Sequence, residues 1–216
     1  MIVIGLTGKI GSGKSTTSKI IKGLGYNVFD CDECSKVLMN TSDVKDEVIS
    51  TFKKNENNII TNNHFDIKAF GNHVFSHPED LLKLEKILHP KIKRKEKQFV
   101  RTNCLQKEKI VFIDIPLLFR ENNHLRFDYI IYVYINMSVQ SQRVLKRPTM
   151  NKKKFINIMN KQKYNNLKYN KFISLKINTG NGKNYVRKKL ILFINKIKDL
   201  NKKKVWPNIY NFYNKM

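Results

Sequence analysis

The sequence is poor in several residue types, and each shortage excludes a class of protein. It contains one alanine, Ala69, with only three cysteines and five prolines among 216 residues. Three cysteines cannot all pair, which argues against a disulfide-stabilised scaffold and favours a reducing compartment, here the cytoplasm. The longest apolar runs, at 110–115, 129–135 and 190–194, are far shorter than the roughly 20 residues of a membrane span. The first residues carry no basic segment or cleavage site, so no secretory signal is expected.

Acidic residues are scarce in the second half of the chain. The whole sequence has 42 Lys and Arg against 17 Asp and Glu, a net charge of +25, and Asp199 is the only acidic residue after position 128. A basic half is compatible with nucleic acid, anionic membrane or polyphosphate ligands. Only seven of the basic residues are Arg, however, and the abundance of Lys and Asn is typical of an AT-rich genome. The charge by itself therefore selects no partner.

Hydrophobic patterning predicts an α/β protein. Short apolar runs predict strands at 2–6, 27–30, 109–115, 129–135 and 172–177. Helical spacing is found at 14–24, through much of 43–101, at 139–147 and 151–168, and at 183–200. We expect Gly25 to stop the first helix, Ser138 to cap a later one, Pro78 to occupy a first helical position, and 55–63 to form a polar loop. Strands that alternate with helices favour a parallel sheet covered on both faces.

One glycine-rich segment carries a complete phosphate-binding pattern. The residues Gly8-Lys9-Ile10-Gly11-Ser12-Gly13-Lys14-Ser15 match G-x-x-x-x-G-K-[ST], between a predicted strand and a predicted helix. The glycines let backbone N–H groups face phosphate oxygens, and the helix N-terminus adds its positive dipole end. We expect Lys14 to reach the β- and γ-phosphates and Ser15 to supply an oxygen to Mg²⁺. Asp114, at the end of the 109–115 strand, is predicted to help hold that metal.

The phosphate-binding loop does not by itself separate kinases from GTPases and motor ATPases. The chain lacks an Asn-Lys-x-Asp segment for guanine and an Asp-x-x-Gly switch, and it is short for a motor or a helicase. A small phosphotransferase is therefore the predicted class.

Two carboxylates follow the second predicted strand. Asp30 and Asp32 lie where a parallel sheet points toward the bound γ-phosphate, and a carboxylate there can orient or deprotonate an attacking alcohol. An aspartate at this place can also simply cap the next helix. We favour Asp32 as the catalytic group and leave the role of Asp30 open. Cys31 and Cys34 have the spacing of half a zinc site, but no second pair completes it.

The order and spacing of these motifs resemble the dephospho-CoA kinase family. The resemblance begins with G-L-T-G-K-I-G-S-G-K-S-T over 5–16, Leu24-Gly25 and Asp30-Cys31-Asp32. It continues through Val74-Phe75 with Pro78-Glu79, Leu88-His89-Pro90, Ile115-Pro116-Leu117-Leu118-Phe119, Gln140-x-x-Arg143, Gln162, Lys168 and Asn178-Thr179-Gly180. The matches run from residue 2 to about 180, and the combination is far more specific than the phosphate-binding loop alone.

This resemblance implies a P-loop kinase fold, a five-stranded parallel sheet flanked by helices, with a helical substrate-binding insertion and a lid. It also implies transfer of the γ-phosphoryl group of MgATP to the ribose 3′-hydroxyl of dephospho-CoA, the last step of coenzyme A biosynthesis. ATP would be bound by Gly8, Gly11, Ser12, Gly13, Lys14, Ser15, Thr16, Arg143, Arg147, Asn178 and Gly180. Catalysis would fall to Asp32 and Lys14, the acceptor side to Asp32, His89, Pro90, Pro116 and Leu117, and Mg²⁺ to Ser15 and Asp114.

The resemblance further implies one kinase domain over 1–200, with the CoA-binding insertion at about 40–107 and the lid at about 146–168. A basic, aromatic tail follows at 201–216. Several positions depart from the family pattern. Arg120 replaces a usual Glu, Pro148 replaces a usual Asp, Lys36 and Ile158 replace usual arginines, and Phe172-Ile173 replaces a usual Ala-Asp.

Two other functions stay open at this point. Another small-acceptor P-loop kinase, acting on a nucleoside, a nucleotide or a shikimate-like alcohol, would share the loop and the sheet. A degenerate P-loop protein could instead bind RNA or an anionic membrane through the basic half and the tail aromatics Trp206, Tyr210, Phe212 and Tyr213. We expect ATP and dephospho-CoA as partners, and no specific nucleic acid. The sequence leaves the oligomeric state open.

Overall fold

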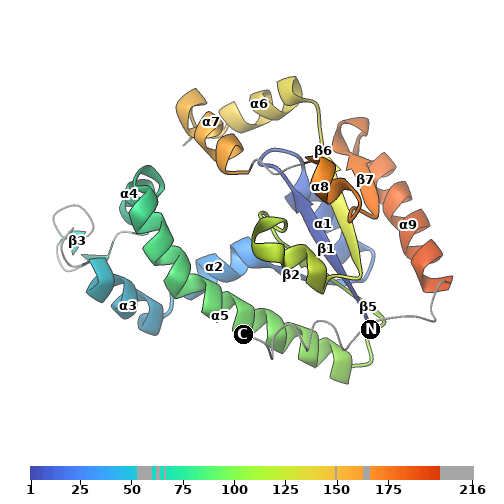
Figure 1. The fold of residues 1–216 in the computed structure, drawn as a ribbon, viewed down its shortest axis with the longest axis horizontal. Helices are drawn as coiled ribbons and strands as arrows, with labels where there is room; N and C mark the ends of the chain where they lie inside the picture. The colour runs from blue at the N-terminus through green and yellow to red at the C-terminus, as the bar shows by residue number, and fades with distance from the viewer. Residues whose placement is uncertain (53–59, 62–63, 66, 149, 163–165, 200–216) are drawn as a thin grey trace. The chain divides into compact units, whose positions relative to one another are not determined.

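The computed structural model describes residues 1–52, 60–61, 64–65, 67–148, 150–162 and 166–199 (Figure 1). The predicted tail at 201–216 lies outside these residues. The chain divides into two compact units, one formed by Met1–Asp30 with the chain from Val100 onward, the other by Cys31–Phe99. Among the helices of the described residues, none is both long enough and apolar enough to cross a membrane.

The first unit is built on a five-stranded parallel sheet. Its strands are β1 (Ile2–Gly8), β2 (Asn27–Asp30), β5 (Ile110–Asp114), β6 (Tyr129–Tyr134) and β7 (Leu175–Asn178), in the spatial order β2-β5-β1-β6-β7. All four neighbouring pairs are parallel. Strand β5 is buried along its whole length, which explains its unbroken apolar sequence before Asp114. The predicted fold class is confirmed.

The C-terminal edge of the sheet gathers the candidate residues. From the central strand β1 the chain continues to β2 at one edge of the sheet. After β5 it passes β1 and continues to β6, on the other side of β1. Ligands of open α/β sheets bind at the carboxyl ends of the strands, where the connections change sides in this way. Asp114 is paired in register with Leu6 of β1 and, on its other side, with Asp30 of β2. The loop after Gly8 and the two aspartates therefore share one edge.

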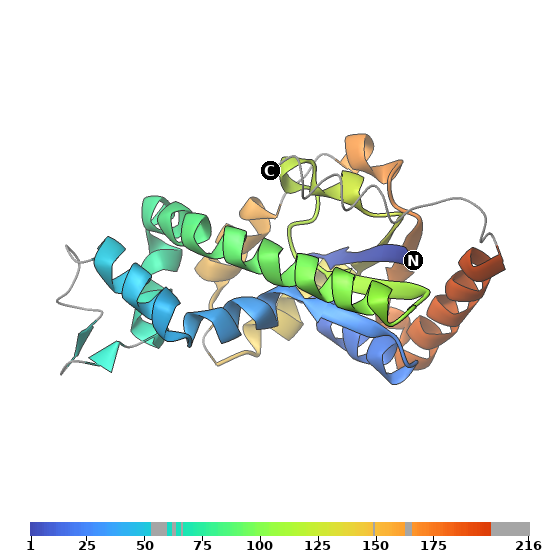
Figure 2. The same cartoon turned by 90° about the horizontal axis from the view of Figure 1, so that it is seen from below.

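Helices cover both faces of this sheet. Helices α1 (Lys14–Gly23) and α9 (Lys183–Asp199) lie on one face, and the 3-10 helix η2 (Arg120–Arg126) with α8 (Asn166–Asn170) lies over the other (Figure 2). Helix α9 buries one apolar stripe against the sheet, made of Val186, Leu190, Ile194 and Ile197. Helices α6 (Met137–Leu145) and α7 (Lys152–Lys161) follow β6.

The second unit is mainly helical. It contains α2 (Cys31–Met39), α3 (Ser42–Phe52), α4 (Ile67–Ser76) and the first part of α5 (Pro78–Leu105), with a short hairpin of β3 (Ile60–Thr61) and β4 (His64–Phe65). The rings of Phe52 and Phe70 pack edge to face in its core, with their centroids 5.1 Å apart. Helix α5 begins at Pro78, as predicted, because proline suits the first helical position.

Three local predictions differ from the structure. The last strand begins at Leu175 rather than Phe172, because the backbone N–H groups of Phe172 and Ile173 bond back to the end of α8. Helix α6 begins at Met137 with Asn136 at its N-cap, so Ser138 lies inside its first turn. Within the predicted polar loop, Ile60–Thr61 pairs with β4, and the rest of 55–63 lies outside the described residues. The stop of α1 at Gly25, which has a φ of +87°, agrees with the prediction.

Candidate active site

The loop from Gly8 to Ser15 joins the end of β1 to the start of α1. Gly11 and Gly13 have φ angles of +74° and +90°, in the left-handed region that favours glycine. A Cβ on Gly13 would lie 2.9 Å from Thr179 Oγ1, and a Cβ on Gly8 would lie 2.5 Å from the carbonyl oxygen of Val133. The loop therefore needs glycine for its backbone conformation and for its close packing.

Three side chains from distant parts of the chain hold this loop by its backbone. The amide of Gln140, on α6, donates to the carbonyl oxygen of Ile10 at 2.5 Å, and the Ile10 N–H donates to Gln162 Oε1 at 2.7 Å. Gln162 is the C-cap of α7. Thr179, in the 3-10 turn η3 (Thr179–Asn181), donates its hydroxyl to the carbonyl oxygen of Ser12 at 2.6 Å. The loop conformation is thus fixed by α6, by the C-terminal end of α7 and by the turn after β7.

Lys14 and Asp114 form an ion pair at the sheet edge. Lys14 Nζ lies 2.5 Å from Asp114 Oδ1, and Asp114 is completely buried. A buried carboxylate requires such a charged or hydrogen-bonded environment to stay ionised. Ser15 and Thr16 are exposed at the N-terminus of α1. A carboxylate at the strand end and a hydroxyl at the helix start are oxygen donors of the kind that Mg²⁺ prefers, so this residue set fits the ion.

The two candidate acceptor carboxylates lie on either side of the boundary between the units. Asp30 ends β2 in the first unit, and Asp32 lies in the first turn of α2, at the start of the second. Asp32 is exposed, whereas Asp30 is partly buried. Cys31 and Cys34 carry free thiols. The chain therefore places Asp32 two residues beyond the strand end that is in register with Asp114.

The predicted nucleotide contacts outside the loop lie on the first unit. Arg143 is exposed on α6, and Arg147 is exposed just after that helix. Asn178 ends β7, and its side-chain oxygen accepts a hydrogen bond from the Gly180 N–H at 3.0 Å. Asn178 is also in register with Tyr134, the last residue of β6.

The predicted acceptor-side residues are divided between the units. Pro116 and Leu117 follow β5 in the first unit and are half-buried, and the Thr7 hydroxyl donates to the Pro116 carbonyl oxygen at 3.4 Å. His89 and Pro90 are exposed on α5 in the second unit. Within the first unit, the structure brings together the phosphate-binding loop, Asp30, Asp114 and Pro116.

A cavity of about 550 Å³ borders the loop within the first unit. Lys9, Ser12, Gln140 and Asn160 provide its polar lining. Its apolar walls come from β6, the segment that follows it, and α7, and they consist of Tyr132, Tyr134, Ile135, Met137, Phe155, Ile156 and Met159. Helix α7, part of the predicted lid, therefore forms one wall of a cavity that touches the phosphate-binding loop.

An aromatic cluster lies beside the segment that follows Pro116. His124, on η2, is buried. Its ring centroid lies 4.4 Å from that of Phe172 and 5.2 Å from that of Tyr169, and the centroids of Phe119 and Tyr169 are 4.9 Å apart. Burial lowers the pKa of His124 below its usual value, and the positive charge of Lys168 lowers it further. This histidine therefore favours its neutral form in the folded protein.

Comparison with known proteins identifies the family. The sequence model described as dephospho-CoA kinase matches residues 2–175. The chain belongs to the dephospho-CoA kinase family. It is 37% identical over 162 residues to the dephospho-CoA kinase of Bartonella quintana, covering 75% of this chain and 81% of that protein. It is also 37% identical over 149 residues to the Rhodospirillum rubrum enzyme, covering 69% and 70%.

Solved structures support the fold of this family member. A protein from Thermus thermophilus superposes with a TM-score of 0.71 at 25% identity, covering 93% of this chain and 98% of that one. The dephospho-CoA kinase of Campylobacter jejuni gives a TM-score of 0.58 at 22% identity, covering 90% and 96%. At 22% identity, the similarity to the Campylobacter jejuni structure shows a shared fold only.

The sequence did not predict that three residues contact the phosphate-binding loop of this family member. Gln140 and Gln162 were noted for their family spacing, and Thr179 for its place between Asn178 and Gly180, but none was assigned to the loop. Gln140 lies 130 positions from its loop partner, and Thr179 lies 167 positions from Ser12. No local pattern reports a contact of that kind, because it exists only once the sheet has formed.

Proposed function

We propose that this protein is a dephospho-CoA kinase, which transfers the γ-phosphoryl group of ATP to the ribose 3′-hydroxyl of dephospho-CoA and releases CoA and ADP. In this reaction the 3′-oxygen forms the new bond to the γ-phosphorus, and the bond to the oxygen bridging the β- and γ-phosphates breaks. The single observation that carries the proposal is membership of the dephospho-CoA kinase family over residues 2–175. A complete phosphate-binding loop at the sheet edge supports it.

The loop would supply most of the charge stabilisation. Its backbone N–H groups and the N-terminus of α1 would hold the phosphates, and Lys14 would lie against the β- and γ-oxygens. The ion pair with Asp114 supports this role, because it keeps the Lys14 ammonium group at the end of β5. Arg143 and Arg147 are exposed cations on the same unit and would neutralise further phosphate charge. Asn178 and Gly180 would border the adenine of ATP.

Asp32 would align the acceptor hydroxyl and receive its proton. Its place in the first turn of α2, directly after β2, supports this role. His89, Pro90, Pro116 and Leu117 would line the acceptor side, with the helical insertion at about 40–107 contributing CoA contacts and the segment at about 146–168 closing over ATP. Phosphoryl transfer relies mainly on positioning and charge neutralisation, so precise placement of the acceptor matters more than strong basicity.

A divalent cation is part of the proposal. Ser15 and Asp114 would hold Mg²⁺ together with the ATP phosphates, and the ion would neutralise charge that develops on the β- and γ-oxygens. We further place the protein in the cytoplasm, where its three free thiols would stay reduced.

A panel of acceptors tests the proposal. Purified protein with MgATP should release ADP rapidly with dephospho-CoA, and only at background rate with shikimate, nucleosides or nucleoside monophosphates. The variant Asp32→Asn should lose most of this rate, whereas Asp30→Asn should retain more of it if Asp30 serves mainly to end β2. ADP release that depends equally on another acceptor would overturn the assignment of dephospho-CoA as substrate.

A further inference from the structure

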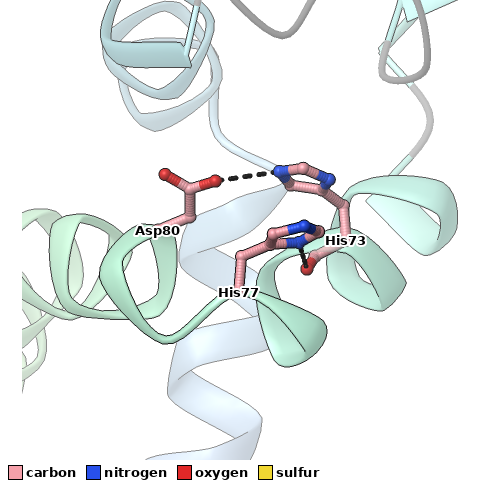
Figure 3. A group of neighbouring side chains, drawn as sticks. All are labelled: His73, His77 and Asp80. Carbon is pink, nitrogen blue, oxygen red and sulfur yellow. Dashed lines mark hydrogen bonds and ion pairs between the residues drawn. The ribbon is translucent and has the colours of Figure 1, made fainter.

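The second unit contains a cluster of side chains that the proposed reaction does not use. His73 lies near the end of α4, His77 lies between α4 and α5, and Asp80 lies in the first turn of α5. Figure 3 shows His73 turned toward Asp80, with the ring of His77 stacked against that of His73 at 4.2 Å between centroids. The residues are four and then three positions apart, and the junction between α4 and α5 brings them together.

The ligand atoms of this cluster lie close together. His73 Nε2 is 2.9 Å from Asp80 Oδ2, and one ligand atom of each residue lies within 4.8 Å of the other two. In a tetrahedral zinc site, bonds of about 2.1 Å place ligand atoms about 3.4 Å apart. His77 is exposed, so its side chain has room to adjust toward that spacing when an ion binds.

The hydrogen bond of His77 prepares this imidazole to act as a ligand. His77 Nδ1 lies 2.8 Å from the carbonyl oxygen of His73, and because a carbonyl only accepts, Nδ1 must carry the proton. The other ring nitrogen of His77, Nε2, then keeps its lone pair. A donor bond from one imidazole nitrogen to a carbonyl is the usual way in which proteins orient a metal-binding histidine.

The charge of Asp80 is also suitable. An aspartate carboxyl is ordinarily ionised at neutral pH, and Lys83 Nζ donates a 2.9 Å hydrogen bond to Asp80 Oδ1. Lys83 holds Oδ1, while Oδ2 faces His73. The ammonium group of Lys83 is the main opposing feature, because it repels a second cation near the same carboxylate.

We propose that His73, His77 and Asp80 form a binding site for a divalent transition metal such as Zn²⁺, Co²⁺ or Ni²⁺. Two imidazoles and one carboxylate favour these ions over Mg²⁺ and Ca²⁺, which prefer oxygen ligands alone. Three protein ligands leave one position of a tetrahedral ion for water. The bound ion ties the end of α4 to the start of α5 and so stabilises the second unit.

A competing interpretation makes the cluster an ion-pair network alone. In that case the contacts of His73 and Lys83 with Asp80 stabilise the helix junction, and no metal is required. The two interpretations differ in what Lys83 does. In the network Lys83 is a favourable partner, whereas at a metal site it competes with the ion.

Metal titration of the nucleotide-free full-length chain separates these interpretations. The protein carries Cys31→Ser, Cys34→Ser and Cys104→Ser, because thiolates bind the same metals. Co²⁺ is followed by its visible absorption and Zn²⁺ by calorimetry. We expect one Co²⁺ per chain, bound through nitrogen and oxygen and not displaced by excess Mg²⁺.

Matched variants locate the site. His77→Ala changes an exposed residue and should weaken Co²⁺ binding by at least about tenfold, since even lost support of a metal ligand costs about 10–100-fold. Glu79→Gln and His89→Gln remove a neighbouring carboxylate and another imidazole of the same unit, and should leave Co²⁺ affinity unchanged. Lys83→Gln should tighten binding severalfold. Failure of the parent to bind Co²⁺ or Zn²⁺, displacement by Mg²⁺, or equal affinity in His77→Ala would overturn the proposal.

Discussion

The Thr179 hydroxyl donates a 2.6 Å hydrogen bond to the carbonyl oxygen of Ser12, although 167 positions separate the two residues in the chain. This bond joins the turn after the edge strand β7 to the phosphate-binding loop after the central strand β1. Thr179 also approaches Gly13 so closely that no side chain fits between them. The conformation of the loop is therefore set by the completed sheet as well as by its own glycines.

Gly13→Ala should destabilise the protein and abolish nucleotide binding. Gly13 has a φ of +90°, which costs an alanine about 1–2 kcal/mol, and the new Cβ would lie 2.9 Å from Thr179 Oγ1. The control is Gly23→Ala, at the other end of α1, where a new Cβ would have no atom within 4 Å. The control should raise the free energy of unfolding by up to about 1 kcal/mol. Chemical denaturation and ATP titration measure both effects, and equal behaviour of the two variants would contradict this account.

Gln162→Ala and Gln140→Ala should weaken ATP binding through the loop backbone. Each glutamine bonds one backbone group of Ile10, so either loss should raise the KM for ATP severalfold and reduce kcat less. Because both side chains hold the same residue, the double variant should show less than the sum of the two effects. Gln142→Ala, exposed on α6, is the matched control. Strict additivity, or an equal effect in the control, would contradict a shared role in holding the loop.

Removal of Lys14 should affect activity and stability by separate routes. Lys14→Met should lower kcat by about 10²–10³-fold, as expected when one preorganised charge at the transferring group is lost. It should also destabilise the fold by roughly 3 kcal/mol, because Asp114 stays buried without that cation. Adding Asp114→Asn to Lys14→Met should recover stability without activity. Thermal unfolding and turnover measured on the same samples separate the two effects, and recovery of activity would contradict the catalytic role of Lys14.

The stability of the first unit should fall as pH falls below about 6.5, the pKa of an unperturbed histidine. Burial holds the pKa of His124 below that value in the folded state, so the unfolded chain takes up the proton first. The stabilisation from neutral His124 is thus present above pH 6.5 and decreases as pH falls toward the folded-state pKa.

Replacement of this histidine isolates its contribution. His124→Phe keeps an aromatic ring among Phe119, Tyr169 and Phe172 but cannot titrate. Nδ1 of His124 has no hydrogen-bond partner within the part of the chain that the structure describes, so its loss removes no such bond. Denaturation curves between pH 7 and pH 5 should show a smaller loss of stability in the variant. An identical pH dependence in the two proteins would show that His124 does not contribute.

Much of the fold was predictable from local sequence. The strand at 27–30 was predicted with its observed bounds, and the motif from Gly8 to Ser15 was correctly placed between a strand and a helix, because apolar runs and a complete motif depend on neighbouring residues alone. The predicted start of β7 was wrong. Phe172 is as apolar as a strand residue, but it lies in a turn before the strand and packs against His124. The N-cap of α6 was placed at Ser138 rather than Asn136, since both residue types cap helices.

The candidate site was predictable only in part. The sequence pointed to Lys14 and Asp114 separately, and the structure joins them in one ion pair. It gave no role to Gln140, Gln162 or Thr179, whose partners lie more than 100 positions away. The cluster of His73, His77 and Asp80 was overlooked because it spans a helix junction at Pro78, where helical spacing is not an obvious guide.

The most direct test of the central claim is product analysis of a single reaction of the purified full-length protein with MgATP and dephospho-CoA. Mass spectrometry and phosphorus NMR identify the product and the ribose position that carries the new phosphate. The account predicts CoA with a 3′-phosphate and an equal amount of ADP. Release of ADP without CoA, or phosphate at any other position of the acceptor, would contradict it.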